Sequence, residues 1–246
     1  MAAPTGEELL PEPLSALLDA AAGVPAGLRA GAEPGWRPAD RLPELIEAEA
    51  RRWDAPPHVA AALLWKSYSY WAVLPVTLGW ALGRRVPLGG PPMLLPLDDE
   101  PHLLVGPRDL TVAVTATDPV AGRPGTVVAA DETALLAMVR RTLLEDHLAP
   151  LIRALHARTR VGERTLWGSV AEAFAYPLAA HAESLPEPAE TVVPALLDGL
   201  GPPVAGLVRP LPGPPGLRRR TCCLWVTLPG AEACPTCCLI REPGER

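Results

Sequence analysis

The cysteines constrain this chain most, because all five lie within its last 25 residues. They are Cys222, Cys223, Cys234, Cys237 and Cys238. The first residues lack the basic and apolar regions of a secretory signal peptide, so we expect a cytoplasmic protein whose thiols stay reduced. In that setting, clustered cysteines indicate metal binding or redox chemistry before disulfides.

The cysteine spacing predicts that two pairs of thiols face each other. Cys234 and Cys237 form a C-x-x-C pair, whose tight loop can direct two sulfur atoms at one metal centre. Ten residues separate Cys223 from this pair, and Pro229 followed by Gly230 is a strong turn signal among them. A hairpin over residues 224–233 would bring the pairs together, and four thiolates so placed can hold [2Fe–2S], [4Fe–4S] or zinc.

The adjacent residues Cys222 and Cys223 favour iron–sulfur over zinc. Neighbouring residues on an extended strand point to opposite faces. Two iron atoms offer such a pair a larger target than one tetrahedral zinc ion does. Spacing alone leaves zinc, disulfides and spare thiols open as alternatives.

The same cysteines resemble the C-terminal signature of the FhuF-type ferric siderophore reductases. That signature reads C-C-x10-C-x2-C, and residues 222–237 match it without a gap. Residues 164–171 read Arg-Thr-Leu-Trp-Gly-Ser-Val-Ala, which is similar to the family's helix pattern Arg-x-Leu-Trp-Gly-x-Val-Ala. The resemblance spans residues 130–246.

The resemblance implies a [2Fe–2S] cluster held by Cys222, Cys223, Cys234 and Cys237. It also implies an enzyme, a reductase that converts Fe(III) in ferric siderophores to Fe(II). Hard oxygen ligands hold Fe(II) far less well than Fe(III), so one electron would release the iron in the cytosol. Cys238 lies outside the signature, and we interpret it as a spare thiol, with ligand exchange for Cys237 as the alternative.

Four residues beside the cysteines are candidates for the environment of the substrate or the cluster. Arg218, Arg219 and Arg220 precede the first pair, and Trp225 follows it. The arginines would draw anionic chelates or stabilise the negative charge of the cluster; the alternative is a solvated basic run. Trp225 either shields the sulfur atoms from water or anchors its loop in the core. No catalytic residue beyond the cluster is expected.

The partners follow from what the chain lacks. Residues 88–92, Leu-Gly-Gly-Pro-Pro, do not have the G-x-G-x-x-G spacing of a dinucleotide site. We therefore expect an external electron donor such as a ferredoxin, a flavodoxin or a flavin reductase. A net charge of -6 argues against nucleic acid, because phosphate binding depends on a basic surface.

Two other classes of function fit parts of the pattern. In the first, zinc staples a helical domain used for protein contacts. In the second, an iron–sulfur protein carries electrons or senses redox state without reductase activity. Metal identity separates the zinc protein from the others, and reduction of a ferric chelate separates the enzyme from the carrier.

The hydrophobic pattern predicts a mainly helical fold with a small antiparallel β-sheet (α+β), ending in an iron–sulfur loop. Residues 59–82 are apolar over roughly the length of a membrane span. Lys66 lies within them and would be costly in a bilayer. We expect a buried core helix rather than a span, with peripheral membrane association left open.

The remaining elements follow from shorter signals. Alternating runs over 86–117, together with residues 126–130, predict strands. The pattern turns helical from residue 131, with Asp131 or Thr133 as the cap and a break or kink at Pro150.

Prolines and glycines divide the chain. Six prolines in residues 201–216 predict a linker without regular structure. Three regions follow: N-terminal helices with the sheet over 1–130, a helical region with its linker over 131–217, and a cluster-binding segment over 218–246.

Overall fold

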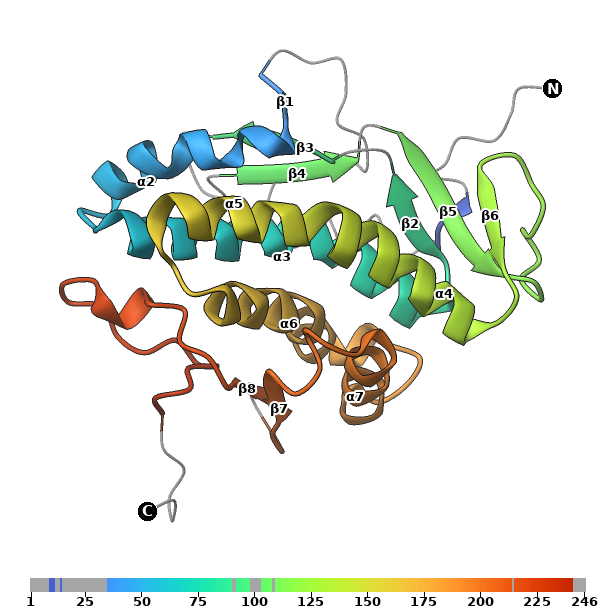
Figure 1. The fold of residues 1–246 in the computed structure, drawn as a ribbon. Helices are drawn as coiled ribbons and strands as arrows, with labels where there is room; N and C mark the ends of the chain where they lie inside the picture. Colours follow the sequence, from blue (N-terminus) through green and yellow to red (C-terminus); the bar gives the residue numbers. More distant parts are fainter. Residues whose placement is uncertain are drawn as a thin grey trace.

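The protein consists of stacked helices with small sheets along their edges (Figure 1). The computed structural model describes residues 9–11, 14, 35–89, 92–97, 103–107, 109–213 and 215–240. The α-helices among them are α2 (Ile46–Arg52), α3 (Pro57–Gly83), α4 (Glu132–Val139), α5 (Ala149–Thr159), α6 (Glu163–Ala180) and α7 (Ala189–Leu200). The predicted mainly helical fold with a small sheet component is confirmed.

Helix α3 is the central element, and it packs most extensively on α6. Pro57 occupies its first turn, where a missing N–H costs nothing, and Arg84 ends it in the left-handed conformation at φ 55°. Trp65, Tyr68 and Trp80 are fully or almost fully buried along it. The predicted core helix over residues 59–82 is therefore confirmed. Among the described helices, none has the length and apolar character needed to cross a membrane.

Asp131 caps α4, since its Oδ1 accepts a hydrogen bond from the Ala134 N–H at 2.8 Å. The predicted break at Pro150 does not occur. A π-helical segment, η3 (Arg140–Leu148), joins α4 to α5, and Pro150 lies in the first turn of α5. Proline lacks the N–H for the next helical hydrogen bond, and the wider π turn before it accommodates that loss. The three segments form one continuous rod (Figure 1).

The predicted strands form two small sheets above and beside α3. One contains β1 (Arg37–Pro38), β3 (Pro92–Pro96) and β4 (Leu103–Pro107); the other contains β2 (Val86–Gly89), β5 (Leu110–Thr115) and β6 (Thr126–Ala129). All pairs are antiparallel except β5 with β6, where Ala113 lies opposite Val127 in a parallel register. The expectation of purely antiparallel pairing is therefore wrong for β6. The turns of residues 116–125 carry the chain back to the starting end of β5, so β6 runs in the same direction as β5.

A third pair of strands falls partly in the expected linker. Strand β7 (Val208–Pro210) pairs antiparallel with β8 (Leu217–Arg219). The prediction that residues 201–216 lack regular structure is thus wrong for β7, because buried Val208 and Leu217 anchor the two strands against the helices. Since β8 contacts α6, the hairpin delivers the cysteine segment onto that helix.

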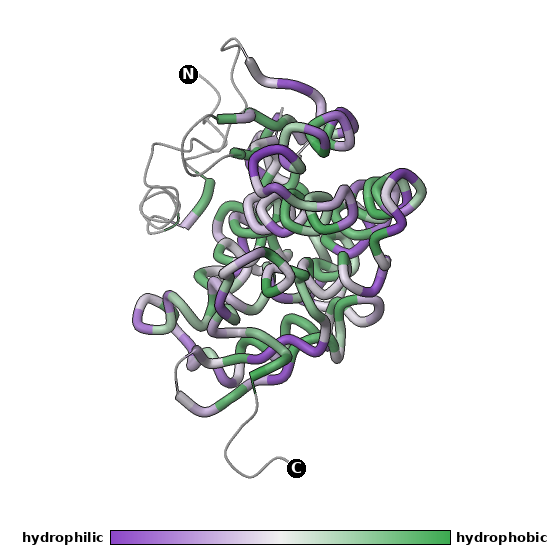
Figure 2. Tube along the Cα trace, turned by 90° about the vertical axis from the view of Figure 1, so that its left-hand side faces the viewer, coloured by the Kyte–Doolittle hydropathy of each residue, from purple (hydrophilic) through white to green (hydrophobic). Residues whose placement is uncertain are grey.

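One large core joins these elements, with buried residues drawn from both sides of residue 130. Trp65 of α3, Phe174 of α6 and Leu217 of β8 all belong to it. Hydrophobic and hydrophilic stretches alternate along the helical turns (Figure 2), as expected of helices with one buried face. The cysteine segment therefore follows a strand, β8, that is anchored in this core through Leu217.

Candidate functional site

Backbone hydrogen bonds hold the two ends of the cysteine segment side by side. The Cys237 N–H donates to the Cys234 carbonyl at 2.9 Å, which closes the C-x-x-C turn. The Arg219 N–H donates to the Thr236 carbonyl at 2.9 Å, so this turn lies against β8. The residues immediately before the first cysteine pair thereby contact the second pair.

The loop between the pairs reverses at the predicted turn but does not form a ladder of paired strands. Gly230 has φ 72°, a conformation that glycine adopts without strain. The 3-10 turn η5 (Trp225–Thr227) occupies the first arm instead of a strand. The turn prediction is confirmed, while the hairpin over residues 224–233 is an irregular loop.

Each of the four cysteines of the signature contacts a group two residues further along the chain. Three sulfur atoms accept from a backbone N–H: Cys222 from Leu224 (3.3 Å), Cys223 from Trp225 and Cys237 from Leu239 (3.5 Å). Cys234 Sγ lies 3.7 Å from the Thr236 hydroxyl, whose proton goes to Glu172. The three N–H contacts stabilise negative charge on sulfur, which is the charge that a metal-bound thiolate carries.

Cys223 and Cys234 meet directly, as the spacing predicts. A hydrogen bond between them lowers the pKa of Cys234 to about 6 and raises the pKa of Cys223. The Lys66 ammonium also lowers the pKa of both thiols. Burial, followed by the charges of Cys222 and Cys237, raises the pKa of the Cys238 thiol.

The thiols lie in one neighbourhood, yet they do not enclose a metal position. All five cysteines are free. Within the part of the chain that the structure describes, no three His, Cys, Asp or Glu side chains are arranged to hold a metal ion. The site is therefore defined by its donors and their hydrogen bonds.

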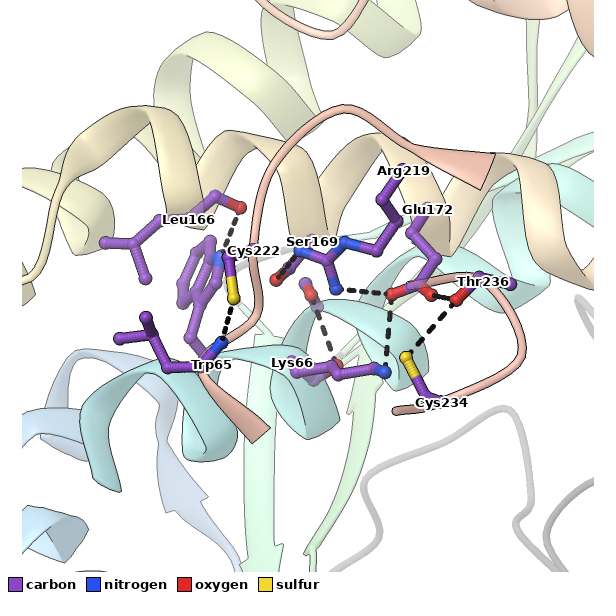
Figure 3. A network of polar contacts seen from close by, with 11 residues as sticks. Trp65, Lys66, Leu166, Ser169, Glu172, Arg219, Cys222, Cys234 and Thr236 are labelled. Carbon is purple, nitrogen blue, oxygen red and sulfur yellow. Dashed lines mark hydrogen bonds and ion pairs between the residues drawn. The ribbon is translucent and has the colours of Figure 1, made fainter. Parts of the chain in front are cut away.

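A buried ionic network lies beneath the cysteine segment (Figure 3). The Arg219 guanidinium donates to Glu172 Oε2 at 2.7 Å and to Ser169 Oγ at 3.0 Å, both on α6. Glu172 Oε1 accepts from the Thr236 hydroxyl at 2.5 Å, and Lys66 Nζ of α3 lies 3.5 Å from Oε2. The Arg219 side chain is 0% exposed and that of Glu172 is 8% exposed, so water does not screen their charges.

A glycine in the Arg-x-Leu-Trp-Gly pattern allows the segment to approach α6. A Cβ on Gly168 would lie 1.7 Å from Thr221 Oγ1 and 2.8 Å from Thr221 Cβ, closer than any real contact. Thr221 directly precedes Cys222. Nearby, Trp65 Nε1 donates to the Leu166 carbonyl at 2.9 Å and fixes α6 against α3. The pattern therefore positions the first cysteine pair.

The arginines of the basic run have three different environments. Arg219 is buried in the network, which excludes both a solvated side chain and direct attraction of chelates for this residue. Its charge lowers the pKa of Cys223, in keeping with a role in stabilising negative sulfur. Arg218 donates to the Ile240 carbonyl at 2.5 Å, and Arg220 is exposed.

Trp225 packs edge-on against Trp53, with ring centroids 5.3 Å apart. Together with Val59, Leu63 and Leu228 they form a small satellite cluster. This contact agrees with the anchoring interpretation of Trp225.

A cavity of about 1150 Å³ adjoins the cysteine segment. Its walls come from α3, α6, α7, the stretch around β7 and the loop containing Cys234. Lys66, Glu172 and Ser169 of the buried network also line it.

Sequence reasoning missed the polar residues of the helices. From the sequence, Lys66 is only an obstacle to membrane insertion, and Glu172 does not stand out. Both carry a detectable signal, since Lys66 is the only lysine of the chain and Glu172 is the only charged residue in the stretch 166–180. Their partners, however, are distant in sequence and could not be identified from spacing.

Comparison with known proteins gives one family. Residues 63–234 match the model of a family described as "Ferric iron reductase FhuF-like transporter". That range is more than half of the 246 residues, and it includes the helices of the site and the cysteines up to Cys234. A search of curated proteins finds no significant match.

We predict that Gly168→Ala destabilises the protein by roughly 1–3 kcal/mol, because the new methyl group must displace Thr221. Adding Thr221→Ala should recover part of this loss, since it removes the nearest atom. Chemical denaturation measures both effects. Gly83→Ala is the matched control, because its Cβ would meet Pro11 Cγ at an ordinary 3.4 Å. Equal stability of Gly168→Ala and the wild type would contradict the close approach.

We also predict that Glu172→Gln destabilises the protein by roughly 3 kcal/mol, since it leaves the buried Arg219 charge without a counterion. The control is Glu145→Gln, which removes an exposed ion pair with Arg140 and should cost less than about 1 kcal/mol. Thermal and urea unfolding compare the two variants. A similar small effect in both would show that the network does not hold the segment.

Proposed function

Because the chain belongs to the FhuF-like ferric iron reductase family, we propose that it reduces Fe(III) in ferric siderophores through a [2Fe–2S] cluster on its cysteine segment. The ligands are Cys222, Cys223, Cys234 and Cys237. The observation that carries the proposal is the backbone N–H contact at three of these four sulfur atoms, together with the direct contact of Cys223 and Cys234.

Two buried donors beside the first pair support the fit. Thr221 Oγ1 and Arg219 Nε are buried and have no hydrogen-bond partner among the described residues. A buried donor without an acceptor costs about 1–3 kcal/mol. Sulfur atoms at this place would accept from such donors, as they do in known clusters. The donor set, four thiols with N–H and O–H groups at hand, therefore suits an iron–sulfur group.

The charges of the site favour thiolates. Lys66 lowers the pKa of Cys223 and Cys234, and Arg219 lowers that of Cys223. Both cations are fixed by Glu172, at 3.5 Å and 2.7 Å, so they stay beside the sulfur atoms. When bound, a [2Fe–2S] cluster supplies a one-electron carrier.

The overall reaction transfers one electron from an external donor to Fe(III). The Fe(II) chelate that results is weak, and the iron is released to the cytosol. A ferredoxin, a flavodoxin or a flavin reductase is the class of donor that we propose. The protein supplies the position of the electron relay and the site of encounter.

We predict that Cys222→Ser and Cys234→Ser lose both visible absorbance and reduction of an Fe(III) chelate, because each removes one of four ligands. Iron, sulfide and trapped Fe(II) are measured on anaerobically purified protein. The control is Cys238→Ser, which should keep absorbance and activity, since Cys238 lies outside the signature.

Unchanged absorbance in Cys222→Ser or Cys234→Ser would refute the ligand assignment. A colourless wild type with stoichiometric zinc, even when prepared without oxygen, would replace the proposal with a structural zinc site. A red-brown protein that leaves Fe(III) chelates unreduced would indicate an electron carrier or sensor.

A further inference from the structure

The cavity beside the cysteine segment has the size of a binding site for a whole chelate. Its volume of about 1150 Å³ slightly exceeds the usual range of small-molecule pockets, about 300–1,000 Å³. A bare ion would leave most of this space empty. Part of its wall comes from α3 and α6, the two helices that pack most extensively on each other, so that part is built on rigid elements.

The lining is mainly apolar and aromatic, with a few polar groups on one side. Trp53, Tyr70, Trp71, Tyr176 and Trp225 contribute the rings. Such a surface suits the carbon skeleton of an organic chelator, while a small number of polar groups orients the ligand.

The cavity reaches the expected electron relay through Cys234. Cys234, Pro235 and Thr236 form part of its wall. Cys223 and Cys237, by contrast, are only 2% exposed. A molecule in the cavity therefore contacts the relay at Cys234.

The polar side of the cavity is formed by Lys66 and its neighbours. Lys66 Nζ lies 3.5 Å from Glu172, whose charge is also neutralised by Arg219. Its side chain remains 35% exposed, which leaves the ammonium able to donate to a ligand in the cavity. Burial raises the pKa of Tyr70, so this phenol stays neutral and can donate as well. Figure 3 shows Lys66 and Cys234 on the same side of Glu172.

Two of the carboxylates in the lining already have cationic partners. Glu49 pairs with Arg52 at 2.6 Å, and Glu172 pairs with Arg219 at 2.7 Å. Lys66 is the one cation among the described lining residues, so it is the group that would attract the negatively charged oxygen ligands of a chelate.

We propose that this cavity binds the whole Fe(III) chelate, with Lys66 donating to its oxygen ligands and Cys234 facing the metal centre. The inference rests on the proposed reductase function but names a place and residues that the function alone does not. Lys66 acts here as a positioning residue.

The test measures binding without electron transfer. The probe is the Ga(III) complex of a trihydroxamate, which has the charge and shape of the Fe(III) complex but cannot be reduced under these conditions. Isothermal titration on the holoprotein gives its Kd. Ala180→Trp fills the rim of the cavity and should abolish binding, and Lys66→Met should weaken it by roughly tenfold, as expected for one charge-assisted hydrogen bond.

The matched control is Val128→Trp, which adds the same side chain at an exposed position on β6 outside the cavity lining. It should bind the probe like the wild type. Ala180→Trp should keep the visible spectrum and the electron transfer to ferricyanide, a small acceptor that needs no cavity.

The outcomes separate the two proposals. Equal Ga(III) chelate binding in the wild type, Ala180→Trp and Lys66→Met would overturn the docking site, as would no binding by a wild type that still reduces the Fe(III) complex. If Ala180→Trp loses binding while Val128→Trp keeps it, the cavity is supported as the docking site. This result would hold even if the wild type did not reduce Fe(III), an outcome that would refute only the proposed reductase function.

Discussion

The buried ion pair between Arg219 and Glu172 is the interaction on which the site depends. It joins β8, which precedes the first cysteine pair, to α6, and the Thr236 hydroxyl ties the second pair to the same carboxylate. A buried pair of this kind adds little net stability compared with apolar residues, but losing one partner is costly. The network therefore fixes where the cysteine segment lies more than it strengthens the fold.

The rest of the site follows from that attachment. Gly168 lets Thr221 lie directly against α6, so Cys222 and Cys223 emerge close to the helix surface. Lys66 reaches the same carboxylate from α3 and places a second cation beside the thiols. The same two helices contribute to the wall of the cavity, which also contains Cys234. One carboxylate thus connects the cysteine segment, the Lys66 cation and the proposed binding site.

The sequence allowed the contact between the cysteine pairs, the core helix and the family to be predicted, because each depends on local spacing or composition. The Pro229 and Gly230 turn is such a case. The buried state of Arg219 could not be predicted, since its partner lies 47 residues away and an arginine run is usually solvated. The ion pair of Lys66 with Glu172 could not be predicted for the same reason, because only the packing of α3 on α6 brings the two residues together. The break expected at Pro150 does not occur, because the π-helical segment before it accommodates the missing N–H of proline.

The central claim is that the cysteine segment on α6 delivers single electrons to a chelated Fe(III). Its most direct test is an anaerobic single-turnover titration of the chemically reduced protein with an Fe(III) trihydroxamate, in which the visible spectrum and trapped Fe(II) are followed together. The account predicts reoxidation of the protein in step with Fe(II), at about one Fe(II) per chain for a one-electron carrier. A reduced protein whose spectrum does not change while the chelate keeps its Fe(III) would contradict it.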